Sequence, residues 1–394
     1  MGKDADIARR IQQISLPFIP YGRQQIGEDD IEAVVEVLRS DWLTTGPQVA
    51  RFEEAVAAFA GGRHGVAVSS GTAALHAAMH AIAVGPGDEV IVPAITFVAT
   101  ANCAAYLGAT PVIVDVDPAT LLIDPEQVRQ HITPRTRAVI SVDYAGQPCD
   151  YGSLRQIADE HNLFLVADSC HSLGAEYRGR RVAEIADLTV FSFHPVKHIT
   201  TGEGGMVVTN TAELAERMRR FRNHGISTDH RQRESLATWF YEMTELGFNY
   251  RISDIGCALG LSQLKKLPDW LARRREIANL YTAALQNIAE VQPLHAAEDV
   301  MHAWHLYVVR LAASIDRAAV FQRMRAKNIG VNVHYLPLHL HPYYRQRVSP
   351  TVLQLPAAEA AYGQILSLPM HAGLTDDDVM RVVSTLWQAV AGAC

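Results

Sequence analysis

The chain has 394 residues, of which 48% are hydrophobic and 20% are charged. This balance is typical of an ordinary globular protein with a sizeable core and excludes a disordered chain. The formal net charge of −7 argues against a dominant nucleic-acid surface. Two arginine clusters, at residues 219–222 and 273–275, lie in helical patterns, and we interpret them as solvated helix faces.

The cysteines and the N-terminus indicate the cellular compartment. The five cysteines are Cys103, Cys149, Cys170, Cys257 and Cys394. They have no CxxC spacing, so neither a disulfide framework nor a zinc site is expected. Residues 1–15 lack the apolar stretch of a signal peptide, and no run approaches the length of a transmembrane helix. We therefore expect a cytoplasmic protein without a metal.

Short apolar runs alternate with helical patterns from residue 63 to residue 209. This rhythm predicts an α/β domain with a mainly parallel, seven-stranded sheet. The predicted strands are residues 65–69, 89–92, 111–116, 138–142, 164–167, 188–193 and 206–209. The predicted helices are residues 72–83, 98–107, 125–131, 151–161 and 212–223.

A long helical pattern follows at residues 253–285, and Pro268 predicts an interruption in it. A second, smaller α/β pattern comes after it. Its predicted strands are residues 305–311 and 330–334, and its predicted helices are residues 317–327, 357–365 and 375–390. We predict a large domain over residues 1–265, including an N-terminal arm, and a small C-terminal domain over residues 266–394.

Lys197 is the only lysine between Lys3 and Lys265. It follows an apolar strand pattern and precedes a glycine-rich turn, which is a poor place for a merely solvating charge. Burial lowers the pKa of an amine, and a neutral amine can form a Schiff base with an aldehyde. Position alone favours a surface lysine, so the residues around it decide the interpretation.

Four further features follow the predicted strands. Small residues including Gly71 and Thr72 open a helix, where backbone N–H groups can hold a phosphate, and Ser192 adds a hydroxyl. Phe97 places a ring at the same edge of the sheet, and Asp168 offers a carboxylate. Each feature taken alone also has a structural explanation, as a helix cap, a core side chain or a turn.

Together these features supply the parts needed to hold pyridoxal phosphate (PLP). They are a phosphate cradle, a stacking ring, a carboxylate for the pyridine nitrogen and a lysine for the aldehyde. Asp168 would keep the ring nitrogen protonated, so that the ring withdraws electrons, and Lys197 would move the proton.

Other kinds of site fit the sequence poorly. The glycines near residue 204 lack the GxGxxG spacing of a dinucleotide site, and no Walker sequence is present. His334, His339 and His341 could be read as metal ligands. No carboxylate or cysteine is patterned with them, and Pro337 and Pro342 indicate an irregular loop, so this reading is disfavoured.

The chain resembles the DegT-type sugar aminotransferases, which are fold-type I PLP enzymes, from Tyr21 to about Val379. The segments that carry the resemblance are residues 43–47, 69–75, 167–175, 191–205, 247–251 and 334–339. Residues 142–146, 193–197 and 239–243 resemble the pseudaminic acid branch of the family most.

The resemblance implies roles for the matching positions. Gly71, Thr72 and Ser192 would contact the phosphate, Phe97 would stack on the ring, and Asp168 would pair with its nitrogen. Asn249 would reach the phosphate from a neighbouring subunit, which implies a homodimer with shared active sites. The positions assigned to the sugar and its nucleotide are Tyr21, Thr45, Arg251, His334, Tyr335 and His339. His171 stands where much of the family has Gln, so the contact on the other ring face differs.

The implied reaction is transfer of an amino group from glutamate to carbon 4 of a UDP-linked keto sugar. In the pseudaminic branch this sugar is UDP-2-acetamido-2,6-dideoxy-β-L-arabino-hex-4-ulose, and pyridoxamine phosphate is the intermediate form of the cofactor. Another nucleotide-linked 3- or 4-keto sugar is the alternative substrate. A related dehydratase would carry His in place of Lys197, and a non-catalytic regulator would need a DNA-binding element that the sequence does not show.

Overall fold

The computed structural model describes residues 16–228, 230–347 and 354–393. The predictions for residues 1–15 and for Cys394 lie outside this part. Within it, no helix is both long and apolar enough to cross a membrane. The four described cysteines are free thiols.

All seven predicted strands of the large domain are present in a single sheet. They are β1 (His64–Val68), β2 (Glu89–Pro93), β3 (Thr110–Val114), β4 (Thr136–Val142), β5 (Phe164–Asp168), β8 (Leu188–Ser192) and β9 (Gly205–Thr209). Their order is β1-β9-β8-β5-β4-β2-β3. Strand β9 pairs antiparallel with β1 and β8, and the other pairs are parallel. The predicted fold class, α/β with a mainly parallel sheet, is confirmed.

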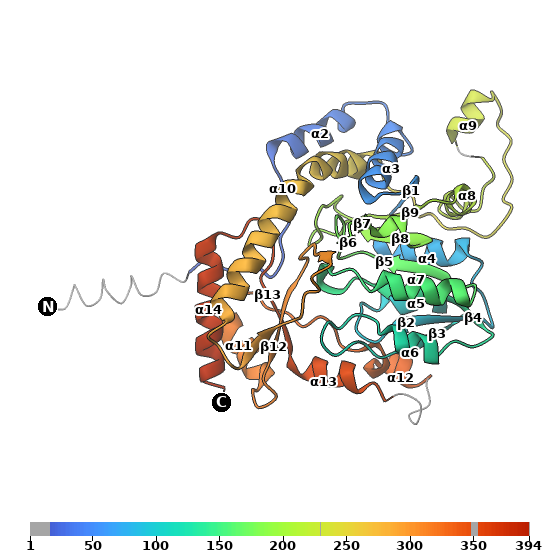
Figure 1. The fold of residues 1–394 in the computed structure, drawn as a ribbon. Helices are drawn as coiled ribbons and strands as arrows, with labels where there is room; N and C mark the ends of the chain where they lie inside the picture. The colour runs from blue at the N-terminus through green and yellow to red at the C-terminus, as the bar shows by residue number, and fades with distance from the viewer. Residues whose placement is uncertain (1–15, 229, 348–353, 394) are drawn as a thin grey trace.

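Helices cover the sheet because alternate strand residues point to opposite faces. Val66 and Val207 pack into the cluster that contains α4, whereas Ala67 and Met206 pack into the cluster that contains α3. Figure 1 shows α3 beside the long helix α10.

The helices that precede α10 in the chain are α2 (Glu28–Leu38), α3 (Pro47–Ala60), α4 (Gly71–Ala81), α5 (Ala99–Ala105), α6 (Pro125–Gln130), α7 (Tyr151–Glu160), α8 (Ala212–Phe221) and α9 (His230–Ser235). A small side sheet joins β6 (Glu176–Tyr177), β7 (Arg180–Arg181) and β11 (Val300–Met301).

The helix α10 (Asp254–Leu285) is continuous through Pro268, so the predicted interruption is wrong. A proline removes one helical hydrogen bond, but packing of a helix against the core can offset that loss. Leu267, directly before the proline, is fully buried against the large sheet's cluster. Figure 1 shows that the axis of α10 bends along its length.

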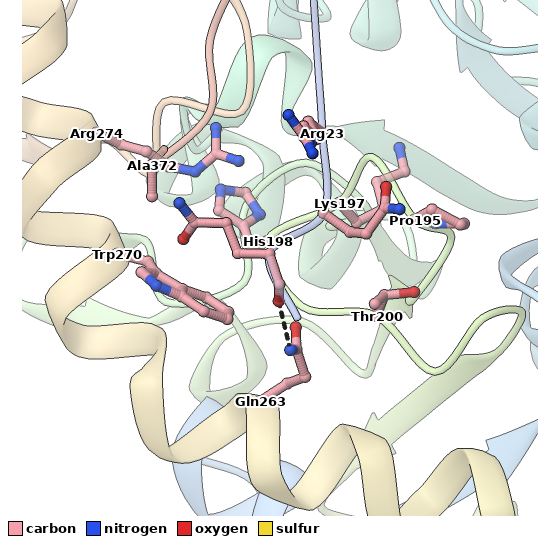
Figure 2. Close-up of a pocket in the computed structure, with 11 residues that line it drawn as sticks. Arg23, Pro195, Lys197, His198, Thr200, Gln263, Trp270, Arg274 and Ala372 are labelled. Carbon is pink, nitrogen blue, oxygen red and sulfur yellow. Dashed lines mark hydrogen bonds between the residues drawn. The ribbon is translucent and has the colours of Figure 1, made fainter. Parts of the chain in front are cut away.

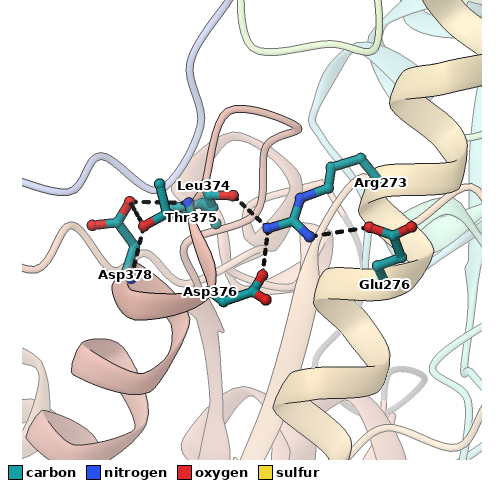
Figure 3. A network of polar contacts seen from close by, with 6 residues as sticks. All are labelled: Arg273, Glu276, Leu374, Thr375, Asp376 and Asp378. Carbon is teal, nitrogen blue, oxygen red and sulfur yellow. Dashed lines mark hydrogen bonds and ion pairs between the residues drawn. The ribbon is translucent and has the colours of Figure 1, made fainter.

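Arginines on α10 fasten it to the C-terminal part of the chain. Arg273 donates hydrogen bonds to the Leu374 carbonyl (2.8 Å) and to Asp376 (2.7 Å) at the start of α14 (Asp376–Ala391), as Figure 3 shows. Arg274 is buried and donates to the carbonyls of Trp304 (3.0 Å) and Met370 (3.1 Å). The interpretation of residues 273–275 as a solvated face is therefore wrong for Arg274.

The smaller sheet is antiparallel and differs from its prediction. It consists of β10 (Val291–Pro293), β12 (Tyr307–Leu311) and β13 (Ile365–Leu368). The predicted strand at residues 330–334 forms only an isolated bridge, between Asn332 and Ser367. The third strand is β13, which follows α13 (Pro356–Gln364) without a loop, so the helix predicted to reach residue 365 ends one residue earlier. The remaining helices are α11 (Arg317–Ala326), α12 (Pro342–Arg345) and three short 3₁₀ turns at Tyr144–Gly146, Val182–Glu184 and Leu338–Leu340.

Residues 330–334 contact two different neighbours, the N-terminal segment and the large cavity. The Gly330 N–H donates to the carbonyl of Ile19 (2.7 Å), which ties the N-terminal segment to the small sheet's core. A few residues later, His334 reaches the large cavity described below.

The hydrophobic contacts change partway along α10. Cys257 and Leu267 pack with the large sheet, whereas Ile277 and Tyr281 pack with the small sheet and α14. This change supports our proposal that the domain boundary lies near residue 266.

Candidate active site

A cavity of about 790 Å³ lies at the carboxyl ends of β5 and β8, next to the start of α4. Parallel strands present the residues after their ends to one edge of the sheet, which is where α/β proteins bind ligands. Ten of the predicted site residues line this cavity: Tyr21, Gly71, Thr72, Phe97, Asp168, His171, Ser192, Lys197, His334 and Tyr335.

Lys197 lies in the loop that follows β8. Its backbone N–H donates to the carbonyl of His194 (2.8 Å), and the Phe193 N–H donates to the carbonyl of Gly204 (2.9 Å), which folds the loop back on itself. Burial lowers the pKa of the Lys197 amine, while the neighbouring Cys170 and Asp168 oppose that shift. A lowered pKa increases the neutral, nucleophilic fraction of the amine.

The other side of this loop borders a smaller polar pocket, shown in Figure 2, which Arg23, His198, Trp270 and Arg274 also line. There the side-chain amide of Gln263 donates to the Gln25 carbonyl (2.8 Å). This bond holds the N-terminal segment against α10 beside Lys197.

Asp168 is the last residue of β5 and is buried. Its carboxylate accepts a hydrogen bond from the Thr100 hydroxyl (2.8 Å) and one from the Cys170 N–H (3.3 Å). Thr100 in turn bonds to the hydroxyl of Thr96 (2.7 Å). Neither threonine was predicted: Thr100 lies in the helix α5, but Thr96 lies before it, so no helical spacing joins the two in the sequence.

The start of α4 forms an anion cradle. Ser70 caps the helix by accepting from the Ala73 N–H (3.1 Å), and the first turn has no acidic residue. The N–H groups of Gly71 and Thr72 belong to this first turn, which has no partners within the helix. A Cβ on Gly71 would lie 2.9 Å from the Cβ of Ser192, so only glycine allows the loop and strand to approach so closely. The cradle therefore fits a phosphate.

Aromatic side chains and histidines surround the middle of the cavity. The Tyr335 hydroxyl and His171 Nε2 lie 3.1 Å apart, and the His171 ring lies 4.3 Å from that of His305. Burial lowers the pKa of both histidines well below the usual range. Phe97 leaves 55% of its surface exposed, which makes its ring available to a ligand. His305 also lines the cavity and was missed, because nothing in its sequence position marks it.

His334 is fixed at the edge of the cavity. Its Nδ1 lies 2.9 Å from the Ser367 hydroxyl, and its ring lies 5.5 Å from the ring of Tyr21. Burial, aided by the charge of Lys197, lowers the pKa of His334 to about 3. His334 is therefore a neutral hydrogen-bonding group at physiological pH.

The other four predicted residues lie outside this cavity in the single chain. Thr45 and Arg251 line a second cavity of about 580 Å³. Asn249 forms an isolated bridge with Asn223, and the buried His339 lies 3.1 Å from Glu359 of α13. Of the histidines considered as metal ligands, His334 and His339 bond to different residues, and the described residues contain no group of three or more potential metal ligands.

An apolar arm, residues 236–248, follows α9. In Figure 1 the part next to α9 stands out from the large sheet, while residues 242–248 return along residues 221–227. Trp239 is 85% exposed and Leu246 is 75% exposed. The arm's other exposed apolar residues are Leu236, Phe240, Tyr241, Met243 and Phe248. A contiguous patch of this kind marks an interaction surface.

The fold and the cavity define a fold-type I PLP-dependent aminotransferase. The chain belongs to the DegT/DnrJ/EryC1/StrS aminotransferase family, which it matches over residues 24–387. The spore coat polysaccharide biosynthesis protein SpsC of Bacillus subtilis is 41% identical over 95% of this chain and 98% of its own length.

Solved structures agree with this assignment. A Streptococcus pneumoniae protein assigned as a sugar aminotransferase, in its PMP form, is 32% identical with a TM-score of 0.91, covering 95% of this chain and 100% of that one. The PLP form of the same protein also matches. PseC of Helicobacter pylori, an aminotransferase involved in pseudaminic acid biosynthesis, is 33% identical with a TM-score of 0.89 and covers 95% and 100%. The protein is thus a PLP-dependent sugar aminotransferase.

Proposed function

We propose that the enzyme transfers the amino group of glutamate to carbon 4 of a UDP-4-keto-6-deoxy-N-acetylhexosamine. The proposed sugar is UDP-2-acetamido-2,6-dideoxy-β-L-arabino-hex-4-ulose, in the route to pseudaminic acid. The observation that carries this proposal is the likeness to PseC over 95% of the chain, together with a cavity that unites Lys197, Asp168 and His334.

Within the cavity, each side chain has a proposed role toward the cofactor. Bound PLP supplies an electron sink for the carbon that loses its proton. Lys197 would hold the cofactor until the amine of the substrate displaces it, and the released lysine amine, whose pKa burial lowers, would then move that proton. Asp168 keeps the ring nitrogen protonated, and Thr100 orients its carboxylate.

The remaining contacts position the cofactor. The cradle of Gly71, Thr72 and Ser192 would hold the phosphate, and Phe97 and His171 would contact the ring. Tyr21, His334 and Tyr335 meet the sugar from the same chain. The buried neutral groups among them, such as His171 and His334, would orient the keto group toward Lys197.

The site is completed by a second copy of the chain in a homodimer. Asn249, Thr45 and Arg251 lie outside the cavity in one chain, and the apolar arm next to Asn249 leaves large side chains such as Trp239 exposed within the described part of the chain. We propose that the arm packs on the partner, so that Asn249 contacts the partner's phosphate and Thr45 and Arg251 contact the nucleotide. His339 contacts the sugar only if its bond to Glu359 opens.

The test combines the enzyme, PLP and glutamate with a panel of keto sugars linked to UDP, TDP or GDP. Mass detection of the amino sugar and measurement of 2-oxoglutarate release identify the substrate. We expect the named UDP-4-keto sugar to be converted most efficiently and Lys197→Ala to convert none. Conversion of other sugars only would contradict the proposal.

A different nucleotide-linked 3- or 4-keto sugar is the second candidate. It is favoured by the 41% identity to the spore coat protein and by 34% identity, with a TM-score of 0.85, to DesI, which was solved with its TDP-sugar product. The TDP sugars of the same panel separate the two candidates.

A further inference from the structure

Two histidines on α4 hold the segment that leads to Asn249. Nδ1 of His76 lies 3.1 Å from the Tyr250 hydroxyl, and Nε2 of His80 lies 3.0 Å from the Glu245 carboxylate. His76 and His80 are four residues apart, so they lie on the same face of the helix, one turn from each other. The segment 245–250 is therefore attached near both of its ends.

Aromatic packing reinforces the attachment at His76. Its ring, which is only 3% exposed, lies 5.1 Å from Phe221, 5.0 Å from Phe248 and 5.9 Å from Tyr250. The rings of Phe248 and Tyr250 are stacked on each other at 5.0 Å. The ring of His80 stacks on Phe221 at 4.0 Å. Such contacts restrict both the position and the rotation of the segment.

The backbone of the segment decides where Asn249 points. The N–H groups of Phe248 and Tyr250 donate to the carbonyls of Phe221 (2.7 Å) and Arg222 (3.0 Å), as in a short strand. Side chains alternate along such a segment. With Phe248 and Tyr250 packed against His76, Asn249 faces the opposite side, where it is exposed.

The same segment touches the phosphate cradle of its own chain. The Ser69 N–H donates to the Tyr250 carbonyl (2.8 Å), and Ser69 directly precedes the cap of α4. The first residues of α4 therefore line the cavity of their own chain, and residues in the middle of α4 contact the segment that carries Asn249.

We propose that His76, with His80, is a positioning residue that acts in trans: it clamps the segment 245–250 so that Asn249 meets the cofactor phosphate held by a second copy of the chain. This inference rests on the shared homodimeric site proposed above. In such a dimer, α4 would line the active site of its own chain and also hold the segment that reaches the active site of the partner.

The test uses His76→Phe, which keeps an aromatic ring but loses the hydrogen bond, and Tyr250→Phe, which loses only the hydroxyl. We expect each variant to retain PLP about tenfold less tightly during dialysis, followed by absorbance, and to lose a similar factor in activity. The double variant should be no weaker than either single variant, since both remove the same bond. Unchanged PLP retention in Tyr250→Phe would overturn the clamp, even if His76→Phe fails to fold.

Mixed dimers distinguish action in trans from action within one chain. Subunits carrying Lys197→Ala and subunits carrying His76→Phe are co-expressed with different tags, and dimers holding both tags are purified. The single site with a lysine then receives its Asn249 from the chain with an intact clamp. We expect about half of wild-type activity, as for one intact site of two. Activity below that of the His76→Phe homodimer would show that His76 acts within its own chain and would overturn the inference.

Two control pairs separate this inference from the function on which it rests. Asn249→Ala mixed with Lys197→Ala should regain activity, whereas Asp168→Asn mixed with Lys197→Ala should not. If Asn249→Ala is not rescued, the shared site itself fails. If it is rescued and His76→Phe is not, only the clamp fails.

Discussion

The cavity and the apolar arm are built on opposite principles. Around Lys197, the side chains of Asp168, His171 and His334 are buried, bonded to neighbours and gathered in one cavity. Around Trp239, large apolar side chains are exposed on a segment that leaves the body of the molecule. A buried site can be preorganised by one chain, whereas an exposed apolar surface is stabilised only when a partner covers it.

Asp168→Asn is the strongest test of the proposed role of the cavity around Lys197. The variant keeps the shape but removes the charge that would hold a proton on the cofactor ring, so we expect activity to fall about 100-fold or more. Thr100→Val, which removes one hydrogen bond to the same carboxylate, should cost only about fivefold to tenfold. Steady-state rates with glutamate check both. Equal rates for Asp168→Asn and wild type would show that the carboxylate has no such role.

Trp239→Asp tests whether a partner covers the apolar arm. If the arm packs on a partner as proposed, a charge at its centre should weaken the proposed homodimer about 30-fold or more, because buried tryptophans dominate interfaces. Trp387→Asp is the matched control, since Trp387 is exposed on α14, away from the arm. Sedimentation velocity over a dilution series measures both variants. A Trp239→Asp protein that dimerises like wild type would place the interface elsewhere.

Acidic pH should lower the free energy of unfolding through the buried histidines. Burial lowers the pKa of His334 and His302 to about 3 and that of His76 and His371 to about 4, below the value near 6.5 in an unfolded chain. The unfolded state therefore binds more protons below pH 6.5, and stability is lost as the pH falls from 6.5 toward 4.

The loss should reach up to about 2 kcal/mol at pH 5 for His334 alone. Unfolding in urea at pH 7.5 and pH 5 measures it. His334→Gln should reduce the dependence on pH, and His194→Gln, at an exposed position of the same cavity, should leave it unchanged. The same pH dependence in both variants would contradict this assignment.

The last expected effect concerns the phosphate cradle. Gly71→Ala places a Cβ against Ser192 and should cost about 1 to 3 kcal/mol of stability, with weaker PLP binding. At Gly85, where an added Cβ meets no atom within 4 Å, the change to Ala should stay within about 0.5 kcal/mol. Urea unfolding and PLP titration compare the two. Equal costs would show that the cradle does not need its close approach.

Prediction from sequence worked best for the large sheet, which is buried on both of its faces. The seven strands of the large sheet are short, continuous apolar runs, which have few alternative structures. Seven of the ten cavity residues end or follow those strands or open the next helix, so strand positions predicted that they lie at one edge of the sheet. The other three, Tyr21, His334 and Tyr335, come from outside that sheet. Thr100 and His305 were missed because their roles come from contacts with Asp168 and His171.

The small domain was predicted less well, for a physical reason. Its sheet is antiparallel, and β13 follows α13 directly, so no loop marks the change from helix to strand, and Gly363 lies within the helix itself. Pro268 is a strong local signal against a helix, but the packing of Leu267 and its neighbours outweighs it. Arg274 shows the same effect, because carbonyls from distant segments satisfy its buried charge.

The sequence by itself determined the class of chemistry. A lone lysine after a buried strand, an aspartate after another and a glycine-led helix start define a PLP site, since each depends on local order along the chain. Only the tertiary structure decided which residues share a cavity and which lie apart. Asn249, Thr45 and Arg251 are separated from Lys197 because contacts between segments remote in sequence, such as Tyr250 with His76, set their direction.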